Sequence, residues 1–80
     1  MFIVYALYSK EFDKIYIGFT SNMDARFYSH NVAATKGYTV KYRPWIILYT
    51  EETESKAAAT KREKELKSSK GRLFIRSLLH

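Results

Sequence analysis

Two short segments near the N-terminus, residues 2–8 and 15–19, are rich in β-branched and aromatic side chains, and the residues between them are mostly polar. This pattern predicts a β-hairpin with a loop of about five or six residues. Because side chains alternate along a strand, Tyr5 and Tyr16 should lie on one face of the hairpin, with Lys14 beside Tyr16. Tyrosine is also a common packing residue of strands, so position alone does not separate a core role from a site role.

A helix should follow the hairpin at once. Ser21 or Asn22 can cap a helix that runs to about His30. At helical spacing, Arg26 and His30 are one turn apart and point the same way. A loop comes next, with Gly37 as its expected turning point.

The second half of the chain predicts one more strand and two more helices. Residues 44–50 form a near-continuous apolar run that is typical of a buried central strand. A helix should begin near Thr53 or Ser55 and continue to about Ser69, and the amphipathic stretch 72–79 should close the chain after a glycine. The predicted class is α+β, with a small three-stranded, mainly antiparallel sheet flanked by helices in the order ββαβαα.

The length and composition limit the chain to a small protein. Eighty residues make one domain, residues 1–80, with room for a single site. The absence of cysteine excludes disulfides and thiolate metal sites and favours an intracellular setting. No apolar run approaches the roughly 18 residues of a membrane span, so we expect a cytoplasmic protein without membrane attachment.

A strong basic excess points to a polyanionic partner. The formal net charge is +6 and the pI is near 9.7, which favours nucleic acid through counterion release. Many basic residues of the C-terminal half have acidic neighbours in helical i,i+4 order, as Glu63 and Lys67 do, and most of them should be a solvated surface. The candidates for nucleic-acid contact are Lys14, Lys36, Lys41 and Arg43.

Glu63 is the carboxylate whose position calls for an explanation. At helical spacing it shares an apolar stripe with Ala59 and Leu66. A carboxylate directed toward a core needs a partner, because an unpaired buried charge is costly. The pattern leaves two partners equally open: an arginine, such as Arg26 or Arg62, or a divalent metal ion.

Five polar or aromatic elements occur in a recognisable order and spacing over nearly the whole sequence. They are Val4-Tyr5-Ala6-Leu7; Tyr16-Ile17-Gly18-Phe19-Thr20; Arg26 with His30 and Asn31; Arg43-Pro44-Trp45; and the run from Ala59 to Lys67. Together they resemble the GIY-YIG nuclease domain. The resemblance is greatest to the small stand-alone bacterial branch, which is related to the catalytic domain of the excision-repair nuclease UvrC. The first element departs from the family name, because it reads Ile3-Val4-Tyr5 where the name has Gly-Ile-Tyr.

The resemblance implies hydrolysis of nucleic-acid phosphodiester bonds, DNA before RNA, by in-line attack of water with one divalent metal ion. Glu63 would be the only direct protein ligand of Mg²⁺ or Mn²⁺. Arg26 would hold the scissile phosphate. Tyr5 and Tyr16 would position water, with Tyr5 the first candidate for the general base and His30 assisting or competing.

Several consequences of this reading are open to test. A phenol with a pKa of about 10 is a poor base, so a catalytic tyrosine would need the fields of Arg26, Lys14 and the metal to stabilise phenolate. Gly18 should let the backbone approach the helix and the substrate closely. Many nucleases of this type have an asparagine in the closing segment, and residues 72–80 contain none.

Two other functional readings compete with the nuclease. One is a basic nucleic-acid-binding module with little or no turnover. The other is a structural or interaction domain in which Glu63 and Arg26 form a buried ion pair. Nuclease domains of this type often obtain specificity from appended DNA-binding modules, so a protein partner is one expected source of selectivity here. The sequence does not predict an oligomeric state.

Overall fold

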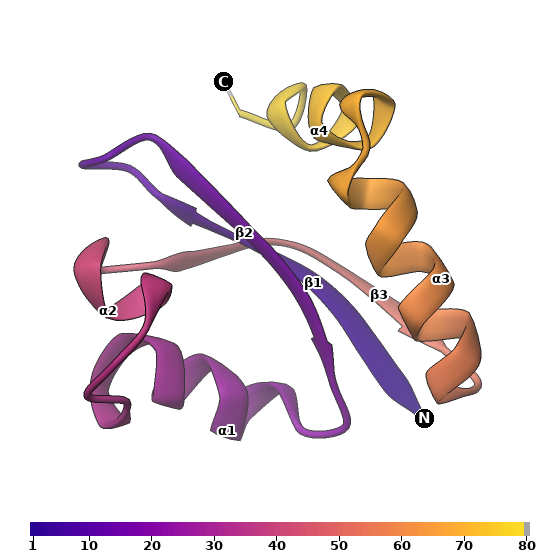
Figure 1. Ribbon diagram of the computed structural model, residues 1–80, viewed down its shortest axis with the longest axis horizontal. Coiled ribbons are helices and arrows are strands. Elements are labelled where there is room, and N and C mark those ends of the chain that lie inside the picture. The colour runs from indigo at the N-terminus through magenta and orange to yellow at the C-terminus, as the bar shows by residue number, and fades with distance from the viewer. Residues whose placement is uncertain (80) are drawn as a thin grey trace.

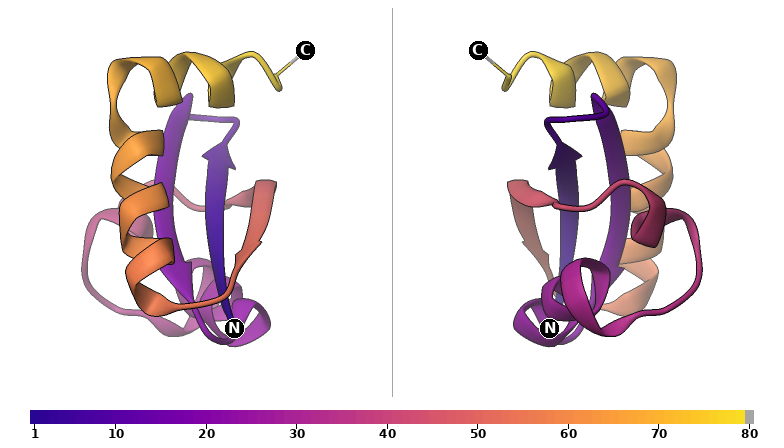
Figure 2. Two further views of the ribbon diagram at one scale, coloured as in Figure 1. Left: turned by 90° about the vertical axis from the view of Figure 1, so that its right-hand side faces the viewer. Right: turned by 90° about the vertical axis from the view of Figure 1, so that its left-hand side faces the viewer.

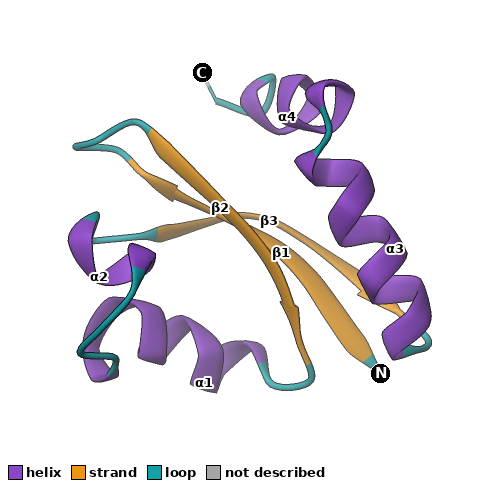
Figure 3. Ribbon diagram, in the orientation of Figure 1, coloured by secondary structure: helices purple, strands orange, loops and turns teal. Residues whose placement is uncertain are grey.

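The computed structural model describes residues 1–79 and contains one antiparallel sheet with helices on both faces (Figures 1 and 3). The strands lie in the order β2-β1-β3, so β1 is central. The predicted α+β class and the order of strands and helices are confirmed. The elements are β1 (Phe2–Ser9), β2 (Lys14–Thr20), α1 (Met23–Tyr28), the π-helix η1 (Ser29–Ala33), α2 (Tyr38–Lys41), β3 (Ile46–Thr53), α3 (Lys56–Lys67) and α4 (Ser69–Arg76).

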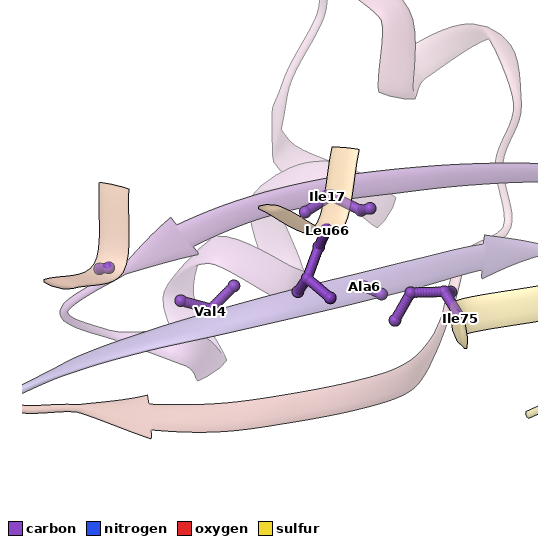
Figure 4. Close-up of a cluster of buried hydrophobic side chains, with 6 residues drawn as sticks. Val4, Ala6, Ile17, Leu66 and Ile75 are labelled. Atoms are coloured by element: carbon purple, nitrogen blue, oxygen red, sulfur yellow. The ribbon is translucent and has the colours of Figure 1, made fainter. Parts of the chain in front are cut away.

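The central strand supplies a buried core on each face of the sheet. Alternation along β1 directs Val4 and Ala6 to the side covered by α3 and α4, and Tyr5 and Leu7 to the side covered by α1 and α2. All four side chains are almost fully buried. The first core also contains Ile17, Ala59, Leu66 and Ile75 (Figure 4), and the second contains Trp45.

The prediction of a buried central strand at residues 44–50 is wrong. The strand β3 begins at Ile46 and lies at the edge of the sheet, where Ile46 and Ile47 are 53% and 44% exposed. Part of the apolar run is explained by Trp45, which precedes the strand and is buried in the second core. Its indole Nε1 donates a hydrogen bond of 2.8 Å to the carbonyl of Thr39.

The helix predicted to end near His30 changes character before it ends. It is α-helical to Tyr28 and continues as the π-helix η1. Arg43 reaches back to this turn and donates hydrogen bonds to the carbonyls of Ser29, His30 and Ala34, at 3.1, 2.6 and 2.7 Å. These bonds satisfy carbonyls that the end of a helix otherwise leaves without a partner.

The connection between η1 and β3 contains little regular structure, but hydrogen bonds hold it in place. Gly37 has a φ of 109°, in the left-handed region that favours glycine, which confirms the expected turn. The short helix α2 that follows it lies where the sequence predicted only a loop. The amide of Asn31 donates to the carbonyl of Trp45 at 2.9 Å and accepts from its N–H at 2.6 Å. This loop therefore holds the start of β3 against η1.

The two C-terminal helices are separated at Ser68, and not at Gly71 as expected. The Ser68 hydroxyl donates to the carbonyl of Glu65 at 2.6 Å and accepts from the N–H of Gly71 at 3.2 Å, so it ends α3 and caps α4. Gly71 lies inside α4, where the two helices approach closely. A Cβ at this position would meet the carbonyl oxygen of Glu65 and the backbone of Leu66.

Helix α4 lies at the hairpin end of the sheet, the end away from the N-terminus, as Figures 1 and 2 show. Arg76 fixes this arrangement with an ion pair of 2.9 Å to Asp13 in the hairpin loop. Within residues 1–79, every helix falls short of the length and hydrophobicity that crossing a membrane requires.

Gly71→Ala should lower the free energy of unfolding by about 3 kcal/mol, because backbone atoms cannot yield to the added methyl group. Chemical denaturation measures the change. The matched control is Lys70→Ala in the same turn, an exposed position that should change stability by less than about 0.5 kcal/mol. Equal stabilities of the two variants would contradict the close approach.

Candidate active site

A buried hydrogen bond joins the first strand to the π-helix. The Tyr5 hydroxyl on β1 lies 2.9 Å from Nε2 of His30 on η1, and the two residues are 1% and 6% exposed. The other imidazole nitrogen, Nδ1, lies 3.0 Å from the hydroxyl of Thr39. The ring of His30 is therefore held at both nitrogens, and Tyr5 and Thr39 are its partners.

Gly18 makes room for the Tyr5 phenol. The two residues pair across β1 and β2, and a Cβ on Gly18 would lie 2.7 Å from the Tyr5 hydroxyl oxygen and 3.0 Å from its Cζ. The phenol therefore extends over β2 at the one position of that strand without a side chain. We expected Gly18 to serve the approach of backbone to helix and substrate, and its evident use is instead to admit this ring.

Tyr16 completes the group, as the hairpin pattern predicted. Its ring centroid lies 4.9 Å from that of His30 and 6.4 Å from that of Tyr5. Lys14, expected beside Tyr16, places its ammonium 5.4 Å from the ring centroid of Tyr42. The two tyrosine rings thus lie on one face of the hairpin. The imidazole that packs against them comes from η1, a later part of the chain.

Burial dominates the electrostatic setting of Tyr5. It raises the pKa of the Tyr5 phenol, and the neighbouring charges of Tyr16 and Glu63 raise it further, while the Arg26 guanidinium acts in the opposite direction. Arg26 thus favours phenolate, as a tyrosine base would require, but in the protein alone burial outweighs the arginine. Stabilisation of phenolate by Arg26, Lys14 and a metal ion together stays a prediction.

His30 is shifted in the direction that keeps it neutral. Burial lowers the pKa of its imidazole, and the positive charges of Arg26 and Arg43 lower it further. A neutral imidazole has one donor and one acceptor nitrogen, so it can accept a proton at Nε2 while Nδ1 donates to Thr39. The site therefore holds a neutral base next to a neutral phenol.

Glu63 approaches the site from the other side of the sheet, on α3. Its side chain is 20% exposed, its Oε2 lies 3.6 Å from Nζ of Lys67, and its charge reaches Tyr5. Within residues 1–79 it forms no ion pair with Arg62, whose guanidinium binds Glu51 at 3.0 Å instead. Among the described residues Glu63 forms no ion pair with Arg26, whose side chain is exposed.

The carboxylate of Glu63 fits a cation that needs few protein ligands. Residues 1–79 contain no cluster of three or more His, Asp or Glu side chains that could enclose a metal ion. Mg²⁺ keeps several waters and is often held by one or two carboxylates together with substrate oxygens. A single, partly buried carboxylate whose charge reaches the Tyr5 phenol is compatible with that mode of binding and not with a closed protein cage.

The structure shows the surroundings of four further residues. Lys36, before α2, and Lys41, the last residue of α2, are exposed, and their role as nucleic-acid contacts stays a prediction. Arg43, also predicted as a nucleic-acid contact, is half-buried and donates hydrogen bonds to three carbonyls. Its positive charge alone did not indicate this structural role. Thr39 escaped the sequence reasoning, because nothing local marks a buried threonine as the partner of an imidazole nine residues earlier.

This arrangement agrees with the comparison with known families. The model of the GIY-YIG catalytic domain matches residues 1–75, and the chain belongs to the GIY-YIG family.

Among known proteins, the chain resembles UPF0213 proteins. It is 37% identical to one from Staphylococcus haemolyticus over 81% of this chain and 78% of that protein. A second, from Natronomonas pharaonis, is 36% identical over 70% of this chain and 66% of that protein. The solution structure of a UPF0213 protein from Bacillus halodurans has a TM-score of 0.56 and 29% identity, covering 99% of this chain and 86% of that one.

The His30 imidazole should titrate below its usual pKa of 6.5, because burial and two arginines oppose its charge. In a His80→Ala background His30 is the only histidine, and NMR can follow it alone. Arg26→Gln should raise the midpoint. The unfolded chain binds more protons than the native state below pH 6.5, so stability should fall as the pH falls through that window. A midpoint at or above 6.5 would contradict this setting.

Gly18→Ala should lower the free energy of unfolding by about 1–3 kcal/mol, since the new methyl group overlaps the Tyr5 phenol. Tyr5→Leu removes the two phenol atoms that would be closest. In a double-mutant cycle, most of the cost of Gly18→Ala should therefore disappear in the Tyr5→Leu background. Additive costs, measured by denaturant unfolding, would show that the phenol does not need this gap.

Proposed function

We propose that this protein is an endonuclease that hydrolyses phosphodiester bonds of nucleic acid, DNA in the first place, with one divalent metal ion. GIY-YIG domains are generally endonucleases, and membership of the family supports this reaction class. The observation that carries the proposal within this chain is the buried hydrogen bond between Tyr5 and His30. A phenol held against a neutral imidazole, close to an exposed guanidinium, is equipped to move a proton beside a phosphate.

Tyr5 and His30 can act together as the base. With its pKa raised, Tyr5 rests as a phenol that donates its hydrogen bond to Nε2 of His30. As the attacking water gives a proton to the Tyr5 oxygen, the phenol proton passes to Nε2. Nδ1, which then bears the other proton of the imidazolium, donates to Thr39. This relay requires no phenolate in the resting state. It ends with the attacking water as hydroxide, Tyr5 again as a phenol, and His30 as an imidazolium.

Arg26 is the candidate for holding the scissile phosphate. Its side chain is exposed, and its charge acts on both Tyr5 and His30. A guanidinium carries a permanent charge and can donate two parallel hydrogen bonds to phosphate oxygens. Tyr16, half-buried against His30, would restrict where the water can sit.

Glu63 would hold the metal ion, Mg²⁺ or Mn²⁺, with water and substrate oxygens as the other ligands. When bound, the ion stabilises the negative charge that develops on the leaving oxygen. Lys67 is the present partner of this carboxylate at 3.6 Å. The pair is long and the lysine is half-exposed, so the ammonium can yield its place at little cost.

Glu63→Gln should reduce cleavage by about 100-fold or more while leaving nucleic-acid binding intact, because charge stabilisation by a metal contributes several kcal/mol. Cleavage of labelled single-stranded, duplex and flap DNA with Mg²⁺ or Mn²⁺ measures the first effect, and binding with a chelator measures the second. The matched control is Glu65→Gln on the same helix, whose carboxylate is 52% exposed and should matter little.

Two results would contradict the proposal. If the wild-type protein cuts none of these substrates but binds them, and Glu63→Gln changes neither property, the protein is a nucleic-acid-binding module. If Glu63→Gln and Arg26→Gln both lower stability strongly and neither affects any nucleic-acid assay, the site is structural.

A further inference from the structure

A basic groove follows the outer edge of β2, beside the candidate active site. It has a volume of about 460 Å³, and its lining comes from three parts of the chain. One part is β2, an edge strand, together with Asp13 of the hairpin loop just before it. The second is α2, which contributes Tyr38, and the third is the C-terminal region of α3 and α4, which contributes Lys67, Arg72 and Arg76.

The charge of this groove is strongly positive. Four cationic side chains line it, against the single carboxylate of Asp13, which Arg76 already neutralises. Arg72 and Arg76 are one helical turn apart and share one face of α4. Arg72 is exposed and its Nε makes one long bond of 3.3 Å, to the carbonyl of Lys67. Its guanidinium is available to an anion in the groove.

Tyr38 gives the groove an exposed aromatic surface. Its ring is 46% exposed and is supported from behind by Tyr16, at 6.2 Å between centroids with an interplanar angle of 27°, and by Tyr42 at 4.8 Å. A rigid, solvent-exposed ring next to cationic side chains is the arrangement on which proteins stack unpaired bases. A paired base inside a duplex cannot reach such a ring.

The groove is continuous with the candidate active site. Tyr16 lines the groove and also contacts His30 and Tyr5. Lys67, at the other wall, is the ion-pair partner of Glu63. A strand that lies in the groove therefore leads directly to the residues that would cut it.

We propose that this groove binds a single strand of nucleic acid next to the scissile phosphate, with Arg72 and Lys14 contacting backbone phosphates and Tyr38 stacking on a base. The proposal rests on the nuclease function proposed above and adds the class of substrate. The protein would act on nucleic acid that is unpaired at this point, such as single strands or flaps, in preference to a continuous duplex.

Binding without cleavage tests the groove. Fluorescence anisotropy with a labelled oligothymidylate and a blunt duplex hairpin, both in the presence of a chelator, gives the two affinities. Tyr38→Ala should weaken single-strand binding about 5- to 100-fold, as the loss of one stacked base does, and change duplex binding less than about twofold. Tyr38→Phe keeps the ring and should bind like wild type.

The charge contribution is tested with two double variants that remove equal charge. Lys14→Ala/Arg72→Ala removes groove residues, and Lys61→Ala/Lys70→Ala removes exposed residues that do not line it. For the first, the slope of log affinity against log salt should become shallower by about 0.7 for each lost phosphate contact. For the second, the slope should stay close to the wild-type value.

Three results would overturn the groove assignment: equal effects of the two double variants, an equal effect of Tyr38→Ala on both probes, or the absence of single-strand binding by the wild type. These results are distinct from failure of the proposed catalysis. A protein that cuts duplex DNA but fails these binding tests retains the nuclease proposal alone. A protein that passes them but cuts nothing retains the groove alone.

Discussion

The Tyr5 phenol, extended over Gly18 to His30, is the interaction on which the rest of the site depends. It requires a glycine in β2 directly opposite the tyrosine, a π-helical turn that brings the imidazole within 2.9 Å, and a second hydrogen bond, between Nδ1 of the ring and the Thr39 hydroxyl, that fixes the ring. Each requirement comes from a different element. A site of this kind therefore forms only when the hairpin, η1 and α2 are folded together.

The central strand β1 links this site to the helix on the other face. Val4 and Ala6 of that strand pack with Leu66 of α3, and Tyr5 between them points to the site. Leu66 and Glu63 are three residues apart on one face of α3. The packing of Leu66 therefore also fixes the position of the Glu63 carboxylate relative to the sheet. A single strand, buried on both faces, thus positions the phenol and the metal-binding candidate relative to each other.

The sequence predicted what depends on local pattern and missed what depends on long-range contact. Alternation placed Tyr5 and Tyr16 on one face, and helical spacing placed Glu63 toward the core. The error at β3 arose because an apolar run reports hydrophobicity and not the number of neighbouring strands, and Trp45 supplied much of the signal. Thr39, the structural use of Arg43 and the groove around Tyr38 all depend on residues that only the folded chain brings together.

In the proposed reaction, Arg26 would connect substrate binding to the strength of the base. In the free protein its charge helps to lower the pKa of His30, which keeps the imidazole neutral. A phosphate bound to Arg26 would offset that charge and add negative charge nearby, and both effects favour imidazolium. His30 would then become a stronger proton acceptor for the Tyr5 phenol when substrate is present. The same guanidinium would thereby hold the phosphate and restrict the proton relay to the bound state.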